Sequence, residues 1–167
     1  MAESVAVRRA RVSDVRTIKS LVDSYAGKVL LRKPLVTLYE DVQEFWVATG
    51  TDGQVLGCGA LHVLWEDLAE LRTIAVSRQC LRSGVGHALV DALVGLGREL
   101  RLSRLFVLTF ETAFFTRHGF VEITGTPVTE DVYAQMRSSA DEGVAEFLDL
   151  PYVKPNTLGN SRMLLEL

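Results

Sequence analysis

The chain has 167 residues, 48% of them hydrophobic and 23% charged, with a net charge of −3 at pH 7. This length suits one domain with a sizeable core, so we expect residues 1–167 to form a single domain. The acidic balance argues against general nucleic-acid binding, no apolar run has membrane-spanning length, and the His and Cys spacing gives no metal-site pattern.

The N-terminal sequence lacks the apolar core of a signal peptide. Cys58 and Cys80 are too few for a disulfide framework. We therefore expect free thiols and a cytoplasmic protein.

The first half of the chain reads as one strand, two helices and three further strands. Ser13 is expected to cap the first helix and Gly27 to stop it, while Pro34 keeps the residues before it out of a helix. The Asp52-Gly53 pair is typical of a hairpin turn, which indicates an antiparallel meander. The expected ranges are strand 5–11, helix 13–25, extended segment 30–33, helix 35–42, and strands 44–49, 54–65 and 70–76.

The second half begins with a glycine-containing turn that leads into a long amphipathic helix ending near residue 100. Pro151 and Pro155 limit regular structure near the C-terminus, so residues 141–155 are expected to have mixed character. The other expected ranges are strand 105–108, helix 112–117, strand 120–123, helix 130–139 and strand 160–167.

The turn contains Gly84 and Gly86, which lack a Cβ and let a ligand approach the backbone. The helix that follows offers unpaired N–H groups and the positive end of its dipole, which favour an anion such as phosphate. Arg82 adds a positive charge. A plain strand-to-helix turn is the alternative, and neither a P-loop nor a dinucleotide fingerprint matches.

Two motifs resemble the GNAT acetyltransferases. Leu81 to Gly86 is similar to the family's pyrophosphate loop, although Leu81 replaces its Gln or Arg, and Phe114 to Phe120 is similar to its aromatic-glycine corner. The resemblance implies an α/β (α+β) fold, in which helices flank a mixed central sheet with a splayed strand pair. VLLRK, CGALHVLWEDLAELRTIAV, RLFVLT and NSRMLL further resemble the acetyltransferase domain of bacterial N-acetylglutamate synthase, here in a stand-alone short form.

This resemblance implies transfer of the acetyl group of acetyl-CoA to the α-amino group of glutamate, or of glutamine, as the first step of arginine biosynthesis. Two alternatives stay open: a GNAT enzyme with another acceptor (a different amino acid, a protein N-terminus or a lysine), and a non-catalytic CoA-binding sensor. A homodimer is one arrangement that the sequence leaves open.

The resemblance also implies where acetyl-CoA binds. The strand backbone at Thr73, Ile74, Ala75 and Val76 is expected to pair with the pantetheine arm, and Phe114, Phe115 and Arg117 are expected to flank the cofactor. Phe115 stands where many relatives carry a proton-donating tyrosine, and phenylalanine cannot donate a proton. The residues expected to hold the pyrophosphate are Leu81, Arg82, Ser83, Gly84, Val85, Gly86 and His87.

Glu70 matches the family's acidic residue on the central strand and is the candidate general base. The alternative is a surface glutamate in a turn beside Glu66 and Asp67. Thr109 is the candidate hydroxyl near the sulfur, or else an ordinary residue at a strand end. An amino-acid acceptor needs a cation for its carboxylate, and the candidates are Arg32, Lys33, Arg72 and Arg162.

Overall fold

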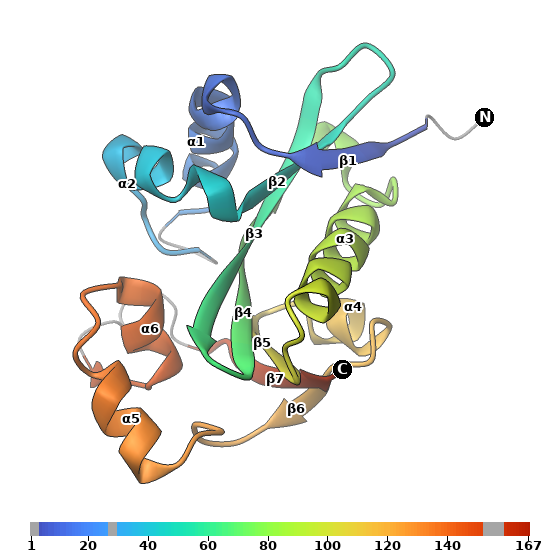
Figure 1. Cartoon of the computed structure of the whole chain (residues 1–167). Coiled ribbons are helices and arrows are strands. Elements are labelled where there is room, and N and C mark those ends of the chain that lie inside the picture. The colour runs from blue at the N-terminus through green and yellow to red at the C-terminus, as the bar shows by residue number, and fades with distance from the viewer. Residues whose placement is uncertain (1–3, 27–29, 152–158) are drawn as a thin grey trace.

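The structure, a computed structural model of the chain, describes residues 4–26, 30–151 and 159–167. Gly27, the expected end of the first helix, and Pro155 lie outside the described residues. Figure 1 shows a central sheet with helices on both faces. No helix in these described ranges is long and apolar enough to span a membrane.

Seven strands form one mixed sheet in the order β1-β2-β3-β4-β5-β7-β6. All neighbouring strands are antiparallel except β4 and β5, which are parallel. The predicted meander is confirmed as β2-β3-β4. The strands are β1 (Ala6–Arg9), β2 (Phe45–Thr49), β3 (Val55–Trp65), β4 (Leu68–Val76), β5 (Arg104–Thr109), β6 (Val121–Ile123) and β7 (Ser161–Glu166).

The helices form two pairs on one face of the sheet and a layer on the other (Figure 1). The first pair packs against β2, β3 and β4, and the second against the C-terminal half of the sheet. The opposite face carries α3 and α4. The helices are α1 (Val15–Asp23), α2 (Leu35–Glu40), α3 (Val85–Glu99), α4 (Thr112–Thr116), α5 (Glu130–Met136) and α6 (Glu142–Phe147).

Two glycines of β3 let α3 pack closely against the sheet. A Cβ on Gly57 would lie 3.1 Å from a methyl carbon of Leu89, and one on Gly59 would lie 3.0 Å from Leu93. Both leucines are fully buried, in keeping with the apolar stripe of the helix. These two glycines therefore allow the close approach of α3 to the sheet.

The strands β4 and β5 splay apart, as the family resemblance predicts. They pair only where Leu68–Leu71 face Arg104–Val107, so the rest of β4 leaves an edge open toward β5. At the point of divergence Thr73 has a φ of 58°, and two residues of β4 oppose Gly59 alone. This β-bulge bends β4 and increases its twist.

The prediction that Ser13 caps the first helix is wrong. Ser13 caps nothing: the carboxylate of Asp14 instead accepts the backbone N–H of Arg11 at 2.7 Å and a two-pronged contact from Arg8 at 2.8 and 3.0 Å. The hydrogen bond from Arg8 lowers the pKa of Asp14, although burial opposes it. In the C-terminal region, the segment expected to be mixed contains α6, because Asp141 caps it by accepting from the backbone N–H of Val144 at 2.9 Å.

Candidate active site

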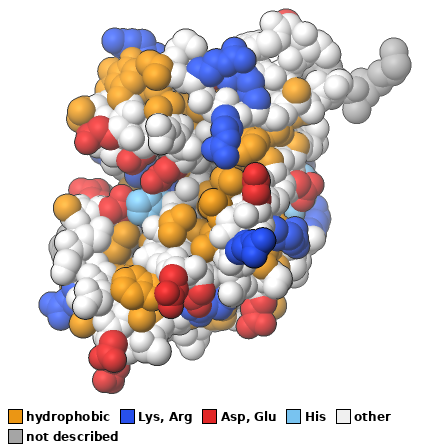
Figure 2. Space-filling model, viewed as in Figure 1, with side chains coloured by type: hydrophobic (Ala, Val, Ile, Leu, Met, Phe, Trp, Pro, Cys, Tyr) orange, Lys and Arg blue, Asp and Glu red, His pale blue; other side chains and the backbone are white. Residues whose placement is uncertain are grey.

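A cavity of about 40 Å³ lies between the two helix pairs, beside the splayed end of β4. This volume is enough for more than one water molecule. Figure 2 shows acidic side chains gathered where the two helix pairs meet. The cavity lining includes Leu31 and Lys33 before α2, Glu70, Arg72 and Thr73 on β4, and Gly143 on α6.

Glu70 is buried in the wall of this cavity, with only 3% of its surface exposed. It stands in β4 between two strands, opposite His62 of β3 and Phe106 of β5. Burial raises its pKa from 4.5 to about 7, although the charge of Arg72 pulls in the opposite direction. The structure therefore excludes the alternative of an exposed turn glutamate.

Arg72 joins Glu70 to the N-terminus of α6. Its Nε lies 3.3 Å from Oε1 of Glu70, and its Nη1 donates to Oδ1 of Asp141 at 2.8 Å. Burial raises the pKa of Asp141, but the positive charge and hydrogen bond of Arg72 outweigh it, so the net shift is downward. Within the described residues, Nη2 of Arg72 and Oε2 of Glu70 are buried without a hydrogen-bond partner, which leaves both for a ligand.

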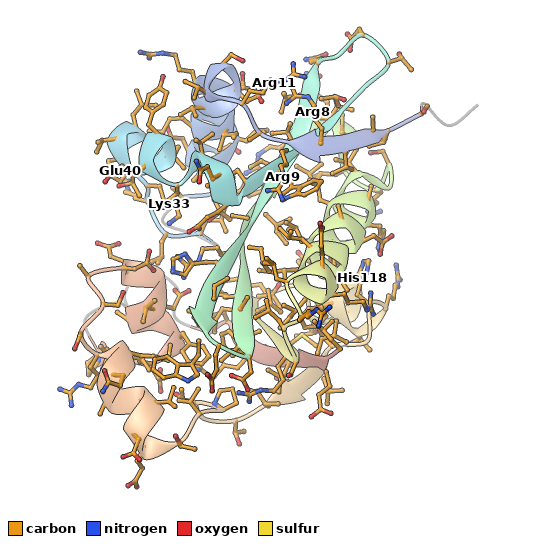
Figure 3. The ribbon with its side chains drawn as sticks, in the orientation of Figure 1. Arg8, Arg9, Arg11, Lys33, Glu40 and His118 are labelled. Carbon is orange, nitrogen blue, oxygen red and sulfur yellow. The ribbon has the colours of Figure 1, made fainter. Side chains whose placement is uncertain are left out.

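The four cations predicted for the acceptor do not come together. Lys33 lines the cavity together with Arg72. Figure 3 shows Lys33 between α2 and α6. Arg32 is exposed and is not part of the lining. Arg162 donates to the carbonyl oxygens of Gly125 and Phe147, so it holds the chain around α6 instead.

The backbone of β4 beyond the bulge presents the open edge expected to receive the pantetheine arm. Two of its carbonyl groups already accept hydrogen bonds within the chain. The Tyr25 hydroxyl donates to the carbonyl of Val76 at 2.7 Å, and the Cys58 thiol donates to that of Thr73 at 3.5 Å. These contacts fix the curved end of β4 against α1 and β3.

The glycine turn leads directly into α3 and is open to solvent. Leu81, Arg82, Ser83 and Gly84 are all exposed, and the chain reverses through positive φ values of 64° at Arg82 and 89° at Gly84. Val85 starts α3 and is buried. The first backbone N–H groups of this helix therefore face an open turn, as an anion site requires.

The aromatic corner packs against the first turn of α3. A Cβ on Gly86 would lie 3.3 Å from the ring of Phe114, and that ring is centred 4.5 Å from the His87 imidazole. Nδ1 of His87 lies 2.8 Å from Nε2 of His118, whose pKa is lowered by burial. Figure 3 labels His118 beside α3.

The other residues of this corner differ in exposure. Phe115 is only 5% exposed and packs in the core edge-to-face against Phe120, whereas Arg117 is exposed. Thr109, at the end of β5, is buried, and its Oγ1 accepts the backbone N–H of Glu111 at 2.8 Å. Its own hydroxyl proton can still be donated.

Sequence reasoning missed Glu146, which lines the cavity, and three polar groups near it: Glu44, His62 and Asp141. Nδ1 of His62 lies 2.8 and 3.0 Å from the two carboxylate oxygens of Glu44. A signal for Asp141 was present, because an aspartate followed by Val144, Ala145 and Leu148 at helical spacing is typical of a capped helix. No cluster of three or more His, Cys, Asp or Glu side chains in the described part of the chain could hold a metal ion.

Comparisons with known proteins match this geometry. The model of the acetyltransferase (GNAT) family matches residues 16–120. An amino-acid acetyltransferase of Mycobacterium tuberculosis is 67% identical over 163 residues, which cover 96% of this chain and 94% of that protein. An amino-acid acetyltransferase of Pseudomonas putida is 31% identical over 68% of this chain, a match that spans 27% of its own length.

Solved structures agree on the fold. The crystal structure of Rv2747 from Mycobacterium tuberculosis in complex with CoA and NLQ has a TM-score of 0.95 at 66% identity, covering 97% of this chain and 99% of that one. N-acetylglutamate synthase from Neisseria gonorrhoeae, complexed with coenzyme A and N-acetyl-glutamate, has a TM-score of 0.77 at 22% identity over 98% of this chain and 35% of that one. The chain belongs to the GNAT family of acetyltransferases.

Proposed function

We propose that the chain is an amino-acid N-acetyltransferase, which transfers the acetyl group of acetyl-CoA to the α-amino group of glutamate or glutamine as the first step of arginine biosynthesis. The relative named amino-acid acetyltransferase, 67% identical along nearly the whole of both chains, supports the reaction class. The CoA in the complex of the 66% identical structure supports the donor.

Glu70 is the general base in this proposal. The α-ammonium group of the acceptor must lose a proton before its nitrogen attacks the thioester carbonyl, and a carboxylate with a pKa of about 7 is suited to take that proton near neutral pH. The nitrogen then forms the amide bond and the carbon–sulfur bond breaks, leaving CoA as a thiolate that takes up a proton. Glu70 acts directly or through a water molecule in the cavity.

Arg72 and Lys33 bind the carboxylate of the acceptor. Arg72 is nine-tenths buried and keeps Nη2 for a ligand, and a guanidinium held in place binds a carboxylate with little loss of side-chain freedom. Because Arg72 also contacts Glu70, an acceptor held on Arg72 brings its amino group near the base. Arg32 lies outside this arrangement.

The donor binds along the splayed edge of β4 and at the N-terminus of α3. The backbone of residues 73–76 pairs with the pantetheine arm, the residues 81–87 hold the pyrophosphate, and Phe114 and Arg117 flank the cofactor. The Thr109 hydroxyl hydrogen-bonds to the departing thiolate, and solvent supplies the proton because Phe115 cannot.

One observation carries the proposal: a buried carboxylate and a buried guanidinium line the same cavity at the open edge of β4. The test is thiol release from acetyl-CoA with each amino acid in turn. Glutamate or glutamine should release thiol faster than the other amino acids, and their ratio chooses between them. No turnover with any amino acid while acetyl-CoA still binds would instead favour a protein acceptor or a CoA sensor.

A further inference from the structure

We propose that His62, held by Glu44, carries the proton from Glu70 to solvent after each turnover. This inference rests on the proposed function, because it assumes that Glu70 takes a proton from the acceptor. Glu70 has a side chain that is only 4% exposed, so it cannot exchange protons freely with bulk water. A buried base must return to its ionised state before the next cycle, and His62 offers a route for its proton.

The sheet places His62 between two carboxylates. β3 lies between β2 and β4, and His62 of β3 is the register partner of Glu70 on β4. Side chains of directly opposed residues in an antiparallel pair stand on the same face, with Cβ atoms about 4.5–5.5 Å apart. Glu44 immediately precedes β2 and contacts His62 from the other side.

The contact with Glu44 determines which nitrogen of His62 accepts a proton. An ionised carboxylate only accepts hydrogen bonds, so Nδ1 of His62 carries the hydrogen that Glu44 receives at 2.8 and 3.0 Å. The neutral imidazole therefore has its lone pair on Nε2, across the ring from Glu44. This tautomer leaves Nε2 able to accept a proton.

Side-chain exposure increases along the row, from 4% at Glu70 to 20% at His62 and 28% at Glu44. The step is a proton transfer alone. The proton leaves the carboxyl group of Glu70 for Nε2 of His62, directly or through a water molecule, and the resulting imidazolium is paired with the Glu44 carboxylate. The imidazolium then gives the proton to water or buffer, which restores both starting groups.

Other acidic groups surround His62. Glu44 faces it from the turn before β2, Glu70 from β4, Asp41 from the end of α2, and Asp141 from the start of α6. A change in the pH profile would therefore not single out His62. Rescue by a small external base does, because only a missing proton carrier can be replaced from solution.

The experiment measures kcat as a function of buffer concentration in the wild type, His62→Ala and Glu44→Gln. In His62→Ala we expect kcat to fall by about 10- to 100-fold at low buffer, less than a full general base contributes, and to recover as imidazole is added. The KM values for both substrates should change little. Glu44→Gln should show a smaller fall of the same kind, whereas Glu40→Gln, an exposed carboxylate on α2 (Figure 3), should match the wild type.

A His62→Ala protein that is folded by thermal unfolding and has wild-type kcat would overturn the proposal, as would a lowered kcat that imidazole does not restore. Glu70→Gln separates this failure from failure of the proposed function. The Glu70→Gln variant should be slow at every imidazole concentration. Wild-type activity in this variant would show that Glu70 is not the general base, which is a failure of the proposed function and not of the proton route alone.

Discussion

Arg72 and Asp141 lie 69 residues apart in the sequence, and their side chains meet in a hydrogen bond of 2.8 Å. The contact joins β4 to the N-terminus of α6 and closes one side of the cavity that Glu70 lines. The backbone of α6 at Gly143 packs directly against the guanidinium of Arg72, and a Cβ at position 143 would clash with it. The position of Arg72 is therefore set by α6 as well as by its own strand.

Gly143→Ala tests this packing. The new Cβ would lie 2.6 Å from Cζ of Arg72, so the guanidinium must move away from its place beside Glu70. We expect the KM for the amino-acid acceptor to rise, with little change in the KM for acetyl-CoA. Gly95→Ala in α3 is the matched control: nothing lies within 4 Å of its Cβ, and the helix should gain about 0.5–1 kcal/mol. Both variants are measured by steady-state kinetics. If the acceptor KM of Gly143→Ala is as unchanged as that of Gly95→Ala, Arg72 does not bind the acceptor.

Arg72 and Arg32 are expected to differ sharply when replaced. Arg72→Ala should raise the acceptor KM strongly, because it removes the buried cation of the cavity, whereas Arg32→Ala should have a small effect, because Arg32 is exposed. Loss of Arg72 also removes the charge that lowers the pKa of Glu70, so the activity of the variant should begin to rise at a higher pH than in the wild type. The acceptor KM of both variants is measured across pH 5–9. A larger rise in Arg32→Ala than in Arg72→Ala would refute the assignment of Arg72 as the acceptor-binding residue.

Glu70 gives predictions for both activity and stability. As a base with a pKa of about 7, it should make kcat/KM rise with pH through neutrality, and Glu70→Gln should abolish that rise together with most of the activity.

With rising pH, the contribution of Glu70 to stability falls, whereas its contribution to activity rises. The pKa of Glu70 is higher in the folded chain than its ordinary 4.5, so the folded state binds more protons between pH 4.5 and 7, and the contribution of Glu70 to stability falls as pH rises across that window. Thermal unfolding should therefore show that the stability of Glu70→Gln, relative to that of the wild type, increases from pH 5 to pH 8. A difference that is constant across pH would mean that Glu70 is not buried as described.

Gly84 tests the donor site. It precedes α3 with a φ of 89°, in an open turn where a side chain meets no atom but strains the backbone. Gly84→Ala should distort the N–H groups proposed to hold the pyrophosphate and raise the KM for acetyl-CoA. Gly53→Ala, with a φ of 81° and equally open surroundings in the β2–β3 hairpin, carries similar strain away from that turn. If both variants lost stability alike and neither changed the KM, the turn would not bind the donor.

Much of the fold could be predicted because it depends on local signals. The Asp52-Gly53 turn, the apolar alternation of the strands and the helical stripe after Gly84 each reflect neighbouring residues, and the family resemblance supplied the splay of β4 from β5. The start of the first helix was misassigned because a hydroxyl at Ser13 competes with a carboxylate at Asp14 that Arg8 also binds. That competition depends on β1, outside the helix itself.

The arrangement of the site was less predictable. Burial of Glu70 depends on β3 and β5 on either side and on α6, which the prolines near it made hard to recognise. Arg32 lies in the VLLRK stretch that resembles the family, but it is exposed, whereas the burial of Arg72 follows from contacts with α6. The row Glu44, His62, Glu70 exists only once strand register is known.

The most direct test of the account is product analysis with all the amino acids present together. Wild type and Glu70→Gln are each incubated with acetyl-CoA and an equimolar amino-acid mixture, and the acetylated products are identified by mass spectrometry. We expect the wild type to form mainly N-acetylglutamate or N-acetylglutamine, and Glu70→Gln to form far less of the same product at neutral pH. An acetylated product of another amino acid, or equal amounts from both proteins, would contradict the proposed acceptor or the proposed base respectively.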